Sequence, residues 1–158
     1  MKDDTIIAKL NDLIEASKDG EQELKRAAEE SREPEFTRAF TDAEQANHAA
    51  SAALQDQVRL LGSTAEQDGS LKAAARRTWT NVKSMMSSRD DSAIVEACER
   101  GQGEVRGRYA EALALELPAP IRSVVERHHR AIVDAHYRLL DLRNRSRDGA
   151  ARALRANG

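Results

Sequence analysis

The chain has 158 residues, of which 40% are hydrophobic and 33% are charged, with only 3 prolines and 8 glycines. This length suits one domain that buries a core without disulfides, and the mixture is typical of helices with charged outer faces and disfavours a β-rich fold. The 25 Lys and Arg nearly balance the 27 Asp and Glu, so a net charge of -2 gives no overall field to attract nucleic acid or an anionic membrane.

Cysteine content and hydropathy indicate the compartment. Cys98 is the single cysteine, which excludes an intrachain disulfide and favours a reducing environment. The opening residues lack the continuous apolar region of a signal peptide, and no stretch approaches the ~18 apolar residues of a membrane span. We therefore expect a cytoplasmic protein without a membrane segment.

In the first half of the chain, apolar side chains recur every three or four residues over two segments, near 4–31 and 35–61. Pro34 separates the segments, because the residue before a proline avoids the helical region while the proline suits the first turn of a new helix. Gly62 ends the second segment. The pattern predicts an antiparallel hairpin of two long helices.

The second half predicts a similar hairpin, with helices near 90–116 and 119–143 separated by a proline-rich turn. A small polar stretch follows Gly62, and the apolar spacing after it indicates a shorter helix near 71–86, packed over the bundle by Trp79. Beyond Arg143 the apolar face is lost, so residues 144–158 are expected to be an Arg-rich tail, frayed or disordered, outside a bundle of residues 1–143.

An internal repeat relates the two hairpins. The segment LIEASKDGEQEL, which begins at Leu13, aligns with IVEACERGQGEV, which begins at Ile94, at an offset of 81 residues. Gly20 then coincides with Gly101, and Glu23 with Glu104. A glycine inside a helix costs up to ~1 kcal/mol relative to alanine, so its occurrence at the same place twice indicates close approach of another helix.

Two related helical hairpins joined by a long crossover that contains a short helix describe the all-α, ferritin-like four-helix bundle. The segments LNDLIEASKDGEQEL, CERG, YAEALALELP and ERHHRAIVDAHYRLLDLR together also resemble a bacterial family of ferritin-like four-helix-bundle proteins that is labelled a domain of unknown function. The resemblance spans roughly residues 5 to 143. It implies this fold but no established activity or ligand.

A ferritin-like metal centre is one candidate site. Di-iron proteins of this group take a Glu from each of two helices and a Glu-x-x-His pair from each of the other two. Glu126 and His129 have that spacing, and Glu23 and Glu104 could supply the single carboxylates. In the remaining helix Glu44 is followed by Asn47 where the histidine should stand. The alternatives are iron or another divalent metal at a degenerate or vestigial site, and charged helix surfaces that hold no metal; we favour the second.

Other chemistry-bearing residues have structural interpretations. His128 lies on the apolar stripe and is expected to be buried and hydrogen-bonded, whereas His136 is expected at a flank. Cys98 aligns with Ser17 in the repeat, so a small interior side chain accounts for it without reactivity. No phosphate-binding loop, dinucleotide fingerprint or nucleophile elbow occurs in the sequence.

The leading functional hypothesis is a non-enzymatic bundle that associates with itself, a dimer first, or with a protein partner. Trp79, Met85 and Met86 are apolar candidates for the contact. The alternative is a metal-binding or redox protein that uses the degenerate site. A third, weaker hypothesis is a nucleic-acid accessory that contacts phosphates through arginines near the C-terminal end of the sequence. Arginines near the carboxyl end of a helix also complement its dipole, and this second explanation is favoured because no aromatic residues are interleaved with them. These arginines are Arg143, Arg145, Arg147, Arg152 and Arg155.

Overall fold

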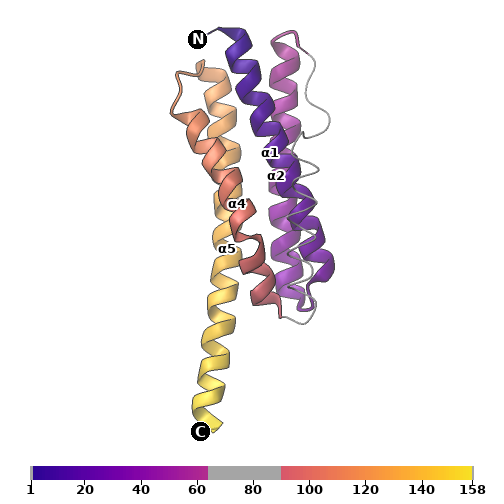
Figure 1. Ribbon diagram of the computed structural model, residues 1–158, viewed down its shortest axis with the longest axis vertical. Helices are drawn as coiled ribbons and strands as arrows, with labels where there is room; N and C mark the ends of the chain where they lie inside the picture. Colours follow the sequence, from indigo (N-terminus) through magenta and orange to yellow (C-terminus); the bar gives the residue numbers. More distant parts are fainter. Residues whose placement is uncertain (1, 64–89, 158) are drawn as a thin grey trace.

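The computed structural model describes residues 2–63 and 90–157, and every regular element within them is an α-helix (Figure 1). The helices are α1 (Asp3–Glu30), α2 (Pro34–Leu60), α4 (Asp91–Leu113) and α5 (Ala119–Asn157). Seven of these eight ends lie within three residues of the predicted bounds, so the prediction of four long helices is confirmed. The short helix predicted near 71–86, with Trp79, Met85 and Met86, lies outside the described residues.

The four helices form a bundle in which α1 packs against α2 and α4, and α5 packs against the same two helices. Asp91, at the start of α4, accepts hydrogen bonds from the backbone N–H groups of Arg32 and Glu33, at 2.9 and 2.7 Å from the nearer oxygen. Helix α4 therefore begins beside the turn that joins α1 to α2, whereas α2 ends at the opposite end of the bundle (Figure 1). Helices α2 and α4 consequently run in the same direction.

The core is divided into two apolar clusters. One gathers side chains such as Leu10 and Leu54 near the start of α1, and the other gathers Phe40 and Leu139 near the α1–α2 turn. The positions between the clusters on three helices are polar or lack a side chain. These positions, which we call the polar layer, are Ser17, Gly20, Asn47 and Gln102, and all four are buried.

Helix α5 continues to Asn157, past the end near residue 143 that the apolar stripe predicts. Residues 144–157 are helical, and the expectation of a frayed or disordered tail stays a prediction. Backbone hydrogen bonds within a helix need no tertiary partner, so loss of the apolar face does not by itself end the helix. These residues are all exposed, and in Figure 1 they stand beyond the other helices.

None of the described helices combines the length and the apolarity that a bilayer crossing requires.

Candidate functional site

Asn47 lies at the centre of the polar layer. Its side-chain amide donates to the backbone carbonyl of Ala43 at 3.0 Å, one turn earlier in α2. The amide oxygen faces Gly20 of α1 and has no hydrogen-bond partner among the described residues. A Cβ atom at Gly20 would lie 2.7 Å from this oxygen, so the glycine makes room for the asparagine.

Glu23 occupies the corresponding position beside Gly101. A Cβ atom at Gly101 would lie 2.5 Å from one carboxyl oxygen of Glu23, whose other oxygen accepts a hydrogen bond from Gln102 Nε2 at 3.1 Å. Burial raises the pKa of Glu23 to about 7; the hydrogen bond from Gln102 acts against this shift, and the negative charges of Glu104 and Asp19 add to it. Both glycines of the repeat thus accommodate a polar side chain of a neighbouring helix.

Ionisable side chains also line the contact between α4 and α5. Glu99 Oε1 lies 3.3 Å from an Arg106 guanidinium nitrogen, and Glu99 Oε2 lies 3.4 Å from His136 Nε2. Burial and the positive charge of Arg106 both lower the pKa of His136. The ring of His129 stacks on that of Tyr109, with centroids 5.8 Å apart, and the Tyr109 hydroxyl is 2.6 Å from Ser17 Oγ.

The five candidate metal ligands occupy different environments. Glu23 is largely buried between α1 and α4, with Glu104 exposed but near enough for its charge to act on the pKa of Glu23. Glu126 is exposed and lies 3.3 Å from the Arg122 guanidinium, one turn away. His129 stacks on an aromatic ring, and Glu44 is half-buried on α2.

Within residues 2–63 and 90–157, no group of three or more His, Cys, Asp or Glu side chains is placed to hold a metal ion together. Asn47, which stands where the template has a histidine, turns its amide oxygen toward Gly20. Metal binding stays a prediction that only a measurement of bound metal can test.

Two histidine predictions are wrong. His128 is half-exposed, and His136 is buried with 7% of its surface exposed. The reason is that α5 packs into the groove between α2 and α4, so its buried face is wide enough to include both Ala135 and His136. The expectation for Cys98 agrees with its surroundings, because the thiol is buried and burial raises its pKa well above the ordinary value.

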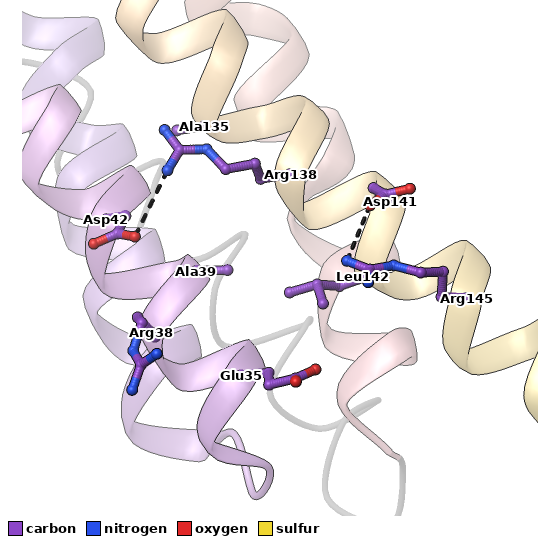
Figure 2. Close-up of a pocket in the computed structure, with 9 residues that line it drawn as sticks. All are labelled: Glu35, Arg38, Ala39, Asp42, Ala135, Arg138, Asp141, Leu142 and Arg145. Carbon is purple, nitrogen blue, oxygen red and sulfur yellow. Dashed lines mark ion pairs between the residues drawn. The ribbon is translucent and has the colours of Figure 1, made fainter.

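A cleft of about 230 Å³ opens between α2 and α5, close to the point where α5 leaves the bundle. Ala39, Ala135 and Leu142 are its apolar residues, and Figure 2 shows Leu142 and Glu35 pointing into the space between the helices. The remaining lining residues are charged: Arg38, Asp42, Arg138, Asp141 and Arg145.

Most of these charges are already paired. Arg138 bridges from α5 to Asp42 on α2 at 3.8 Å, and Arg145 pairs with Asp141 on its own helix at 3.0 Å. Figure 2 shows the Arg38 guanidinium turned away from α5. Glu35 makes no ion pair with any described residue, so the cleft combines three apolar residues with one carboxylate that has no ion-pair partner there.

A family model for a domain of unknown function, DUF2383, matches residues 5–115 of the chain. The chain belongs to this family. No curated protein matches the sequence. The DUF2383 match covers α1, α2 and α4 and ends before α5, so it is shorter than the span of residues 5 to 143 predicted from resemblance.

The DUF2383 match therefore includes the α2 wall of the cleft but not its α5 wall. Sequence reasoning missed the cleft altogether, since Glu35 and Leu142 are more than one hundred residues apart and each fits an ordinary amphipathic helix. The one available signal was that Leu142 closes the apolar stripe of α5 where the arginines begin. That signal marks the end of the bundle but not a cleft.

Proposed function

We propose that this protein is a non-enzymatic helical bundle of ferritin-like layout that works by self-association, and that the exposed part of α5 carries the contact. The observation that supports this proposal is the projection of residues 144–157 beyond the bundle, with every side chain exposed. Leu154 is 75% exposed on this segment.

A helix of 14 residues without tertiary contacts is only marginally stable in water, because nucleation is costly and packing supplies most helical stability. Arg147 still contacts Glu96 of α4, but among the described residues no ion pair joins α5 to another helix beyond that point. A partner surface would supply the packing that this segment lacks.

Charge supports a protein surface as that partner. Residues 144–157 contain four arginines and one aspartate, a net charge of +3, whereas residues 1–143 contain 21 basic and 26 acidic side chains, a net charge of -5. Another copy of the chain therefore presents the opposite charge to the projecting segment, which favours encounter.

Light scattering after size exclusion, over a wide range of protein concentration, tests the proposal. The full chain should show a mass above that of one chain, and removal of residues 144–158 should return it to the monomer. The described residues in this range, 144–157, are all exposed, so thermal unfolding monitored by circular dichroism should show the bundle intact. A monomeric full chain at every concentration would contradict self-association.

A further inference from the structure

His136 is a buried ionisable side chain of α5 that faces a charge pair on α4. Its side chain is 8% exposed, and its Nε2 lies 3.4 Å from Glu99 Oε2. The other oxygen of Glu99 accepts a hydrogen bond from Arg106 Nη2 at 3.3 Å. We infer that these three residues form a pH-sensitive switch, which holds α5 against α4 while the imidazole is neutral and loosens this contact when the imidazole is protonated. The switch lies within one chain, so it is independent of the self-association proposed above.

The charges of the switch balance only when His136 is neutral. Glu99 carries one negative charge and Arg106 carries one positive charge, so the ion pair is neutral before any proton is added. Protonation of His136 leaves two cations that share a single carboxylate. A positive charge on a side chain that is withdrawn from water is costly unless it gains a carboxylate of its own. Protonation therefore weakens the contact between α4 and α5.

Hydrogen bonding shows that this contact is weak at the switch. Among the described residues, Arg106 Nη1 is buried without an acceptor, and Glu99 Oε2 is buried without a hydrogen-bond donor although His136 Nε2 lies 3.4 Å away. A buried polar atom without a partner destabilises the contact that buries it. One added charge is therefore enough to loosen the two helices here.

The groups around His136 favour its neutral form. Burial has the largest effect and lowers its pKa, and the positive charge of Arg106 on α4 lowers it further. Glu99 acts in the opposite direction, whereas Arg143, about two turns further along α5, adds to the lowering. The pKa of His136 therefore lies below the ordinary value of 6.5.

The neighbouring charges of α2 and the next histidine of α5 complete these surroundings. Asp42 of α2 is paired with Arg138, and positions 136 and 138 are about 200° apart around the helix, so this pair lies on the far side of α5 from His136. Burial and then Arg106 lower the pKa of His129 as well. A substitution at position 136 alone separates the two histidines.

Acidification should release α5 from α4, and neutral pH should hold the two together. Because the pKa of His136 in the folded chain lies below its unfolded value near 6.5, the folded chain binds this proton less tightly. The stability that the neutral imidazole supplies is fully present above about pH 6.5 and is lost as the pH falls through the folded pKa. Glu23, whose pKa is raised, acts in the opposite direction.

Amide hydrogen exchange of the full chain, read by mass spectrometry and corrected for the intrinsic effect of pH, measures the release of α5. In the wild type, protection of α5 around His136 should fall about tenfold between about pH 7.5 and about pH 5. His136→Gln cannot take up a proton and should lose this fall. His48→Gln is the matched control: His48 is exposed on α2 beside Glu21 of α1, so the variant should behave as the wild type.

Proton NMR of the imidazole groups gives a second measurement. His136 of the wild-type chain should titrate below pH 6.5. Arg106→Gln should move this titration to higher pH, because it removes a neighbouring positive charge and leaves Glu99 in place. The wild-type titration stands on its own if circular dichroism shows that His136→Gln does not fold.

Three results would overturn the switch. One is a loss of α5 protection in acid that is the same in the wild type and in His136→Gln. Another is a His136 imidazole that titrates at or above pH 6.5. The third is an equal loss of protection in α1 and α2 through the effect of His136, because the release would then not be confined to α5.

Discussion

The carboxyl group of Glu23 is largely withdrawn from water, with one neutral donor, Gln102, and two nearby negative charges, Glu104 and Asp19. Its pKa of about 7 lies above the ordinary 4.5, so the folded chain binds this proton more tightly than the unfolded chain. The stability that this proton supplies is fully present below about pH 4.5 and is lost as the pH rises through about 7.

Replacement of Glu23 by Gln should therefore make stability less dependent on pH. Relative to wild type, the free energy of unfolding of Glu23→Gln should increase by about 1–3 kcal/mol between about pH 4.5 and pH 8, because the amide cannot ionise. Urea unfolding at several pH values measures this difference. Glu126→Gln, at an exposed carboxylate, serves as the control and should show no such trend.

The two glycines Gly101 and Gly107 of α4 allow a second comparison. Gly101→Leu should lower the free energy of unfolding by about 1–3 kcal/mol, since even its Cβ would meet the Glu23 carboxyl. Gly107→Ala should raise it by about 0.5–1 kcal/mol, because no heavy atom of a neighbouring residue lies within 4 Å and alanine favours the helix. Thermal or urea unfolding separates the two; equal effects would mean that α1 does not approach α4 closely at Gly101.

At the scale of helices, α4 begins with two aspartates that have different partners. Asp90 is the N-cap, and its side chain accepts a hydrogen bond from Ala93 N–H at 3.1 Å within the same helix. Asp91 is buried and accepts instead from the turn between α1 and α2. It therefore joins the start of the second hairpin to the bend of the first.

Alanine substitutions should distinguish these roles. Asp90→Ala should cost about 1 kcal/mol, as expected for an N-cap. Asp91→Ala should cost about 2–4 kcal/mol, because it leaves the N–H groups of Arg32 and Glu33 without an acceptor. Urea unfolding of both variants measures the difference, and the interpretation of Asp91 as a link between hairpins is wrong if its loss costs no more than that of the cap.

At the scale of the molecule, the content of bound metal distinguishes the self-associating bundle from the metal-binding alternative. We predict at most weak, substoichiometric binding at Glu126 and His129 and no ferroxidase turnover, since Asn47 cannot replace a histidine ligand with similar affinity for iron or zinc. Elemental analysis after expression in iron-supplemented medium measures the content. Two tightly held metal ions per chain, lost in Glu126→Ala and His129→Ala, would favour the metal-binding alternative.

Much of the fold could be predicted from the sequence by itself. Helical periodicity is local, so the apolar spacing placed all four long helices, and Pro34 and the Pro118–Pro120 segment marked their turns because proline lacks the donor that a continuing helix needs. The repeat also indicated close packing at Gly20 and Gly101. Spacing could not show which side chains fill those places, and they prove to be Asn47 and Glu23.

Tertiary structure decided the rest. The burial of His136 rather than His128 depends on how α5 is oriented between α2 and α4. The apolar stripe of one helix does not define that orientation. The helical state of residues 144–157 could not be inferred from a missing apolar face. The α2–α5 cleft arises where residues more than one hundred positions apart meet, and its carboxylate without an ion-pair partner among the described residues is defined only by which neighbouring arginines already have partners.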